Sequence, residues 1–429
     1  MVSREAKIQR LERELHRIRT SPSLRLGSII TDAMRKPWKA PFLIVTLPWN
    51  MVLIGLEMLG KRRSSNIFER VSQDPTLSER NCVVMFPTNG VGFGHFTRML
   101  ALAKYMKKED STLEVIFFTT MPTLHLLKPY GIPAHHISGS PYFDEMSTIE
   151  WNGLLEEELS ICLEAHRPKQ FIFDGAFPYR GMLNAIKSRP ELDSIWMRRG
   201  TFRRGKSIPV DSISHFDLII HPEDSISMKS SEVEHEVPST TCSPITLIEP
   251  GEQLPKSQAR RRLDLPQDAT VVYVQIGAGE INEINSEIRL TVDALIQHEG
   301  VHIVLGESML GERLDVDIQN VHILRDYPNT LYFNAFDCSI QAGGYNSFHE
   351  VRRFGMPTLF YPNLFTGMDD QLARCLVSVE EGWGQVLEHR DEQSINVAIE
   401  ELLNRAGKSA PLSVESGAIE LAKQLTQRS

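Results

Sequence analysis

The sequence predicts an α/β protein with two tandem domains, each a parallel sheet covered by helices, behind an N-terminal helical extension. From residue 80 onward, short apolar runs alternate with amphipathic segments, and one polar stretch interrupts the alternation. Nearly continuous apolar strands separated by helices are typical of parallel sheets buried on both faces. The chain has 429 residues, 41% of them hydrophobic, which is enough for two cores. We therefore expect a helical extension, two α/β domains and a C-terminal helix, at residues 1–66, 80–240, 266–412 and 413–429.

The individual elements follow from the same alternation. In the first domain we expect strands at 82–87, 113–120, 171–175, 194–198 and 216–221, and helices at 96–108 and 122–130. Residues 222–265 are rich in Ser, Pro, Glu and Thr, and we interpret them as a linker. In the second domain we expect strands at 270–277, 301–306, 321–325, 338–343 and 357–362, and helices at 284–298, 346–354, 369–382 and 394–405. Both halves are Rossmann-like, and ligands of such sheets bind at the C-terminal ends of the strands.

Charge and cysteine usage exclude several classes of protein. The net charge is −9, yet residues 1–63 carry 13 Lys and Arg against five Asp and Glu, which leaves −17 on the rest. A basic head on an acidic body argues against nucleic acid as a partner and favours an anionic surface for the head alone. The five cysteines are scattered without a C-x-x-C pair, as expected of reduced thiols. We expect no cofactor and no metal.

The first residues predict a short helix with one apolar stripe. Ile8, Leu11, Leu15 and Ile18 recur at the three- and four-residue spacing of a coiled-coil seam. The stripe is shorter than two heptads, so it either lies in solvent or contacts a second copy in a homo-oligomer.

Residues 21–63 predict a segment that lies in a membrane surface. Residues 21–41 are amphipathic and basic, and residues 42–60 are almost entirely apolar, with Trp38 and Trp49 among them. A crossing helix needs ~20 apolar residues, and this run is interrupted by polar residues and proline. Lys and Arg flank it on both sides, which favours an interfacial pair of helices on anionic lipid over a spanning helix or one buried against the protein body. We expect a peripheral or monotopic protein on the inner, cytoplasmic face of the cell membrane.

A glycine-rich loop follows the first expected strand. Residues 88–95 read TNGVGFGH, in which Asn89, Gly90, Gly92 and Gly94 allow a close approach of backbone to an anion at the next helix N-terminus. No Gly-Lys-Ser/Thr follows, so it is not a Walker loop, and the absence of an acidic residue after the second strand disfavours dinucleotide binding. We interpret the loop as a phosphate- or acceptor-binding loop.

His95 and Asp174 are the candidate catalytic pair. His95 closes the glycine-rich loop, and Asp174 ends the expected strand FIFDG. Residues at the ends of two strands of one parallel sheet can meet above it. A carboxylate on one imidazole nitrogen would make the other a base for a hydroxyl proton, although a single histidine is more often a capping or surface residue.

The second half carries a more specific pattern, AGGYNSFHE at residues 342–350 and FGMPTLFYPNLFTGMDDQ at 354–371. It resembles the donor-binding segment of GT-B glycosyltransferases, both the nucleotide-sugar glucosyl- and glucuronosyltransferases and the lipid-linked GlcNAc transferase of peptidoglycan synthesis. The resemblance implies that diphosphate, ribose and donor sugar are bound by Gly343, Gly344, Asn346, Ser347, Glu350, Asp370 and Gln371, with Gly277 and Gly279 near the phosphates. It also implies that His95 is the base and Asp174 its partner, without a metal.

Two departures from the family pattern concern the donor site. Ala342 stands where the glucosyltransferase-type motif begins with a histidine that touches the diphosphate, and Tyr345 replaces the Trp of plant-type relatives. Charge stabilisation must then come from elsewhere. Arg198 and Arg199, followed by Arg203 and Arg204, are candidates, unless they form a solvated basic turn.

The resemblance implies an inverting glycosyltransferase that uses a nucleoside-diphosphate sugar, for which we expect UDP. Together with the membrane-binding head it suggests a membrane-linked or polysaccharide acceptor in cell-envelope glycan synthesis. Three alternatives stay open on the same fold: a polyol-phosphate transferase, a nucleotide-sugar 2-epimerase, and a non-catalytic scaffold for a partner transferase.

Overall fold

The computed structural model describes residues 21–58, 80–88, 92–140, 146–198, 210–226, 236–277, 285–307, 318–364, 369–410 and 415–428. The chain forms two compact units, Met1–Leu77 and Ser78–Ser429, and each is described by itself. The predicted seam at residues 8–18 lies outside the described residues, as do the loop residues Asn89 and Gly90.

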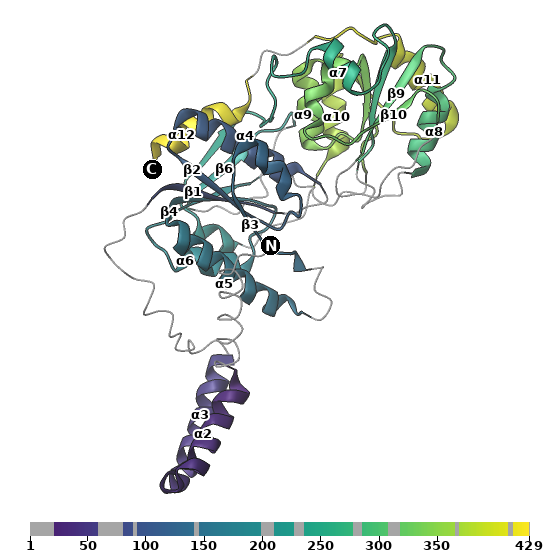
Figure 1. Cartoon of the computed structure of the whole chain (residues 1–429). Coiled ribbons are helices and arrows are strands. Elements are labelled where there is room, and N and C mark those ends of the chain that lie inside the picture. The colour runs from purple at the N-terminus through teal and green to yellow at the C-terminus, as the bar shows by residue number, and fades with distance from the viewer. Residues whose placement is uncertain are drawn as a thin grey trace. The chain divides into compact units, whose positions relative to one another are not determined.

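The first unit contains a pair of helices, α2 (Pro22–Arg35) and α3 (Leu43–Met58), joined by the 3-10 helix η1 (Pro37–Phe42). The two helices pack side by side (Figure 1), and Ala33 in α2 and Ile54 in α3 are buried. Large apolar side chains are exposed along the pair, at Ile30, Met34, Trp38, Phe42, Ile44, Val45, Trp49, Met51 and Val52. Within the described part of the chain, no helix combines the length and apolarity needed to cross a bilayer.

The second unit begins with a seven-stranded parallel sheet in the order β3-β2-β1-β4-β5-β6-β7. Its strands are β1 (Arg80–Pro87), β2 (Glu114–Thr119), β3 (Ala134–His136), β4 (Pro168–Asp174), β5 (Asp193–Met197), β6 (Leu218–Pro222) and β7 (Ser239–Cys242). Side chains alternate between its two faces, so Val83 and Met85 enter one core while Val84 and Phe86 enter the other. Figure 1 shows α4 and α12 on one face and α5 and α6 on the other.

The helices of this domain are α4 (Gly94–Glu109), α5 (Thr148–His166), α6 (Arg180–Lys187) and α12 (Gly417–Arg428). The last of them returns from the far end of the chain and packs against α4. Ser416 precedes α12, and its hydroxyl both accepts from the amide and donates to the carbonyl of Thr246, at 3.0 and 2.9 Å. The C-terminal helix is therefore part of the first domain's core.

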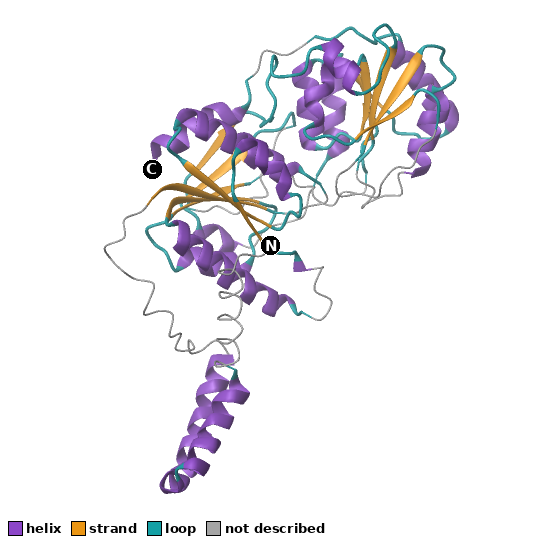
Figure 2. Cartoon of the chain, viewed as in Figure 1, coloured by secondary structure: helices purple, strands orange, loops and turns teal. Residues whose placement is uncertain are grey.

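A six-stranded parallel sheet follows, in the order β10-β9-β8-β11-β12-β13. Figure 2 shows helices on both faces of this sheet. Its strands are β8 (Thr270–Gln275), β9 (Val301–Gly306), β10 (Val321–Leu324), β11 (Cys338–Gln341), β12 (Thr358–Phe360) and β13 (Gly384–Val386). Its helices are α7 (Lys256–Arg262), α8 (Asn285–Leu295), α9 (Tyr345–Phe354), α10 (Gln371–Glu380) and α11 (Glu392–Leu403). In both sheets the strand order reverses beside the first strand, at β1/β4 and at β8/β11, and such switch points are where ligands bind.

The prediction of two Rossmann-like sheets is confirmed, and three local predictions are corrected. Residues 222–265 are not only a linker, because they contain β7 and α7. The helix expected at 122–130 is the 3-10 helix η3 (Leu124–Tyr130), which has Pro129 within it. Short strands β3, β7 and β13, and the helices α5 and α6, were not among the predicted elements.

The docking of α12 yields a stability prediction. Leu421 is buried against the first domain's core, whereas Gln424 on the same helix is exposed. Leu421→Ala should lower the free energy of unfolding by about 2–5 kcal/mol, because a large apolar side chain leaves a cavity, while Gln424→Ala should stay within about 0.5 kcal/mol of the wild type. Urea unfolding of the full chain measures both. Equal effects of the two substitutions would show that α12 does not belong to the core.

Candidate active site

The site is built on two neighbouring strands at the switch point of the first sheet. The amide of Thr88, which follows β1, donates to the carbonyl of Asp174 at the end of β4, at 2.9 Å. The chain then enters α4 at Gly94, and no side chain caps this helix N-terminus. Of the predicted loop glycines, Gly92 and Gly94 are described, and both lie at this entry.

His95 and Asp174 are in contact, as the sequence predicted. His95 Nδ1 lies 2.6 Å from Asp174 Oδ1. The imidazole is 23% exposed, whereas the carboxylate is 1% exposed. A buried carboxylate accepting from Nδ1–H leaves the lone pair of the ring on Nε2, which is the tautomer that a general base requires.

Arg98 is the third member of this group, and the sequence analysis missed it. Its Nε and Nη2 atoms donate to Asp174 Oδ2 and Oδ1 at 3.0 and 2.7 Å. Arg98 Nη2 also lies 2.9 Å from His95 Nδ1. His95 and Arg98 are three residues apart in the first turns of α4 and therefore share a helix face, which is the sequence signal that would have indicated the arginine.

The charges of this group keep Asp174 ionised. Burial alone would raise the pKa of Asp174, but the positive charge of Arg98, together with His95 and hydrogen bonds from both, outweighs it and holds the pKa below its ordinary value. The carboxylate is therefore a fixed acceptor for His95 Nδ1–H across the physiological pH range.

Tyr345 connects this group to the second domain. Two guanidinium groups lie over its ring, with Arg98 Cζ 5.4 Å and Arg374 Cζ 5.8 Å from the ring centroid. Its hydroxyl donates to the carbonyl of Glu223, the residue after β6, at 2.8 Å. Tyr345 therefore links the two domains through cation–π contacts and a hydrogen bond.

A second buried ion-pair network, also missed by the sequence analysis, surrounds Arg374. Its Nη2 pairs with Asp224 at 2.6 Å and with Asp369 at 2.5 Å, and His349 Nε2 lies 3.2 Å from Asp224. Burial alone would raise the pKa of Asp224, but hydrogen bonds and charge from His349 and Arg374 drive it far below the ordinary value. Asp224 belongs to the loop after β6, so this network also joins the two domains.

The N-terminus of α9, where the diphosphate site is predicted, follows a tight turn at Gly343. Gly343 has φ +73°, and a Cβ there would meet Cys375 Sγ at 2.2 Å. Arg374 Nη1 donates to the Gly343 carbonyl at 3.1 Å, which holds the turn. Gly344 is the N-cap residue and offers no side chain, so the first amides of α9 are uncapped.

Asn346 and Ser347 occupy the first turn of α9. Asn346 Nδ2 lies 3.4 Å from the carbonyl of Gly94. Its Oδ1 atom is buried and lacks a hydrogen-bond partner among the described residues. The turn at Gly343 and the entry to α4 at Gly94 are thus adjacent, and a buried polar atom lies at their junction.

Other residues predicted to bind the donor lie outside α9 in the chain. Gly277 follows β8 with φ +106°, and Gly279 lies outside the described residues. Asp370 caps α10 by accepting from the amide of Ala373 at 3.1 Å, and Gln371 Oε1 accepts from the amide of Asn363 at 3.0 Å. Both side chains therefore shape the loop before α10.

Glu350 lies one turn along α9. Burial raises the pKa of its carboxyl to about 8. The group is therefore mostly protonated at neutral pH, a condition that a bound polar ligand would change.

Arg198 lies at the C-terminal end of β5 and is buried. Its guanidinium lies over the Trp196 ring at 5.3 Å, and His221 Nδ1–H donates to its backbone carbonyl at 3.1 Å. These contacts tie Arg198 to the sheet rather than to a solvated turn. Arg199, Arg203 and Arg204 lie outside the described residues.

Comparison with known proteins identifies the fold. Neither a scan against protein-family models nor a search of curated proteins gave a match. Solved structures do match over four fifths of the chain: the glycotransferase of kitacinnamycin (TM-score 0.56, 14% identity, 82% of this chain and all of that one), MurG of Acinetobacter baumannii (0.50, 13%, 81% and 99%) and the calicheamicin glycosyltransferase CalG4 (0.51, 15%, 82% and 94%). The chain has the GT-B fold of nucleotide-sugar glycosyltransferases, and these identities establish the fold alone.

Glu350 gives a pH-dependent prediction. Folding raises the pKa of the Glu350 carboxyl from about 4.5 to about 8. The folded protein therefore loses stability as the pH rises through that range. Glu350→Gln removes this loss, so its gain in stability over the wild type should grow across that window by at least ~1 kcal/mol and then level off. Thermal unfolding from pH 5 to 9 measures it. Glu400→Gln, an exposed glutamate on α11, is the matched control, and a pH-independent difference for Glu350→Gln would contradict the assignment.

Proposed function

We propose that this protein is an inverting glycosyltransferase that moves a sugar from a nucleoside-diphosphate sugar, for which UDP is our expectation, to an acceptor hydroxyl. The observation that carries the proposal is the pairing of two half-sites. A His–Asp base lies at the strand ends of the first domain, and a glycine-flanked, uncapped helix N-terminus lies in the second. Asn346 meets Gly94 at the point where the two half-sites adjoin.

In the proposed reaction, His95 Nε2 removes the proton of the acceptor hydroxyl while Asp174 stabilises the imidazolium that forms. The acceptor oxygen attacks the anomeric carbon and forms the new glycosidic bond. The bond between that carbon and the diphosphate oxygen breaks, and its electron pair leaves with the nucleoside diphosphate. Attack on the side opposite the leaving group inverts the configuration at the anomeric carbon. The proton on His95 passes to solvent.

Stabilisation of the leaving diphosphate is assigned to α9. The first amides of α9 and the positive end of its dipole favour an anion at Gly343, Gly344 and Ser347. Arg98 and Arg374 are each paired with buried carboxylates, so their role is to fix the geometry of the site rather than to carry free charge. Ala342 offers no group to the diphosphate, which makes the backbone contribution larger than in enzymes with a histidine there.

The acceptor and the cellular location follow from the first unit. Its helices and the 3-10 helix η1 that joins them expose large apolar side chains, with Trp38 and Trp49 among them. Arg35, Lys36 and Lys39 lie close to them in the sequence. Such a surface suits the interface of an anionic membrane. We therefore assign the protein to the inner face of the cell membrane, with a membrane-linked or polysaccharide acceptor of envelope glycan synthesis.

A thermal-shift screen against UDP, GDP, CDP, dTDP, ADP and their sugars, without added metal, tests the donor site. A ligand at ~100 times its Kd should raise stability by about 2.7 kcal/mol. A shift with CDP alone would favour the polyol-phosphate transferase. Conversion of the donor without acceptor would favour the 2-epimerase, and no shift with any nucleotide would favour the scaffold.

With the donor known, His95→Ala tests the base. Turnover should fall by about 10²–10⁴-fold, as is usual when a general base is removed. Binding of the nucleoside diphosphate, measured by calorimetry, should change little because the base does not contact it. His136→Ala, in the edge strand β3, is the matched histidine control. Turnover of His95→Ala near the wild-type level would refute this assignment.

The membrane proposal predicts flotation with vesicles. The full chain should float with vesicles that contain phosphatidylglycerol and less with pure phosphatidylcholine, since basic residues add about 1 kcal/mol each on anionic lipid. Deletion of residues 1–63, or Trp38→Ser with Trp49→Ser, should reduce recovery. Phe177→Ser, which removes an exposed aromatic from the second unit, should not. Equal recovery of all proteins would rule out membrane binding by the head.

A further inference from the structure

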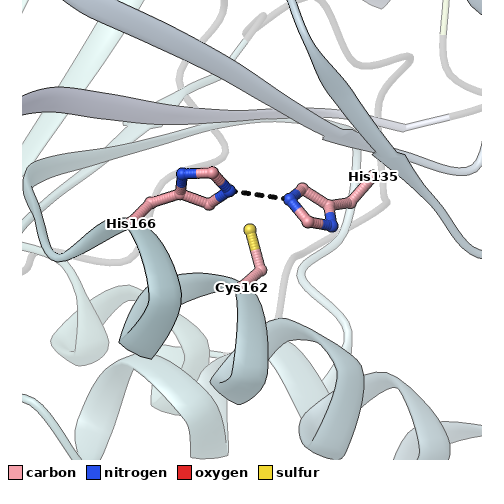
Figure 3. Close-up of side chains that lie close together, drawn as sticks. All are labelled: His135, Cys162 and His166. Atoms are coloured by element: carbon pink, nitrogen blue, oxygen red, sulfur yellow. Dashed lines mark hydrogen bonds between the residues drawn. The ribbon is translucent and has the colours of Figure 1, made fainter. Parts of the chain in front are cut away.

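Two histidines and a cysteine from separate segments meet at the edge of the first sheet. His135 lies in β3, the edge strand, and Cys162 and His166 lie in α5. Figure 3 shows the two imidazole rings facing each other with the thiol beside them. The Nε2 atoms are 2.8 Å apart. One ligand atom from each of the three residues lies within 4.8 Å of the others.

The spacing of Cys162 and His166 along α5 explains why these two side chains lie together. Cys162 and His166 are four residues apart and lie one above the other on the same helix face. Glu158 is one further turn away on that face, and its charge acts on both His135 and Cys162. The helix ends directly after His166, where Arg167 adopts a left-handed conformation. The edge strand supplies the ligand from the other side.

Without a cation, burial favours the neutral form of all three groups. Burial lowers the pKa of His135, and burial together with His135 and Arg80 lowers the pKa of His166. Burial, aided by Cys82 and Glu158, raises the pKa of Cys162 to about 12. Two neutral imidazoles share one hydrogen bond, and the thiol has only weak hydrogen-bonding capacity. The neutral imidazoles are the form that a metal cation binds, and the charge of a cation would oppose the burial penalty on the Cys162 thiolate.

We propose that His135, Cys162 and His166 bind one Zn²⁺ ion, with water as the fourth ligand. Two imidazoles and a thiolate are a donor set that suits zinc and excludes hard cations such as Mg²⁺. Ligand atoms ~2.0–2.3 Å from zinc in a tetrahedral site are about 3.3–3.8 Å from one another. The two Nε2 atoms therefore need to separate slightly, which small rotations of the rings allow.

Binding has a definite proton balance. The Cys162 thiol gives up its proton to solvent and becomes a thiolate, so one proton is released for each ion bound. Both imidazoles bind through Nε2, and the ring that held its proton there moves it to Nδ1 through solvent. The bound ion would fix the edge strand β3 to the end of α5, next to the start of β4.

A second histidine pair offers an internal comparison. His302 Nδ1 and His322 Nε2, in β9 and β10, are 3.2 Å apart. In the described part of the chain, only the group at Cys162 brings three or more metal-binding side chains within ligand distance of one another. The presence of Cys162 therefore distinguishes the proposed metal site from the hydrogen-bonded pair of His302 and His322. This inference is independent of the proposed transferase activity.

The test is zinc titration of the full chain after removal of metal, against a chromophoric chelator, with Co²⁺ as a spectroscopic substitute. The wild type should bind one equivalent of Zn²⁺ with a Kd below about 1 µM, and Co²⁺ should give a thiolate charge-transfer band. Cys162→Ser should abolish the band and weaken Zn²⁺ binding at least ~100-fold. Cys242→Ser, at another buried cysteine, and His302→Gln should bind like the wild type.

His166→Gln is the second ligand variant, and it decides the matter if Cys162→Ser does not fold, as judged by circular dichroism. Loss of the zinc equivalent in either folded variant, with retention in both controls, supports the site. The proposal is overturned if the wild type binds no equivalent of Zn²⁺, if Co²⁺ gives no thiolate band, or if folded ligand variants bind as tightly as the wild type.

Discussion

The buried carboxylate of Asp174 is the constraint on which the rest of the site depends. An ionised carboxylate removed from water costs several kcal/mol unless it is paired and hydrogen-bonded. Asp174 meets this requirement through Arg98 and His95, both from the first turns of α4. Because β4 carries the acid and the loop after β1 leads into α4, the pairing requires β1 and β4 to be neighbours, which the strand order provides. The strand order at the switch point therefore determines the orientation of His95.

The same constraint extends into the second domain. Arg98 pairs with Asp174 and contacts the ring of Tyr345. Arg374 contacts the same ring and pairs with Asp224 from the first domain. A continuous path of charged and aromatic groups therefore leads from the base to the turn at Gly343. Removing one charged member would leave its partner buried and unpaired, which is costly. This explains why the turn at Gly343 and the pair of His95 and Asp174 are positioned together.

The sequence predicted those features of the structure that depend on local residue patterns. Long apolar strands, the helix after each glycine-rich turn, and the meeting of His95 and Asp174 at two strand ends were all predictable from periodicity and order. Strands of three or four residues such as β3 and β13 carry too little pattern, and the docking of α12 on α4 is tertiary. Arg374 and Asp224 are 150 residues apart, and no local signal pairs them. Likewise, His135 and His166 are 31 residues apart, so a search for C-x-x-C spacing could not find their cluster.

The central claim is a division of labour, in which the second domain holds the nucleotide and the first holds the base. Amide hydrogen exchange of the full chain, measured by mass spectrometry with and without a saturating nucleoside diphosphate, tests it most directly. We predict that protection increases in peptides covering residues 341–352 and 275–277, at the starts of α9 and of the loop after β8, while peptides covering β4 and β5 change little. Protection confined to the first domain, around residues 88–98, with none at α9, would contradict the account.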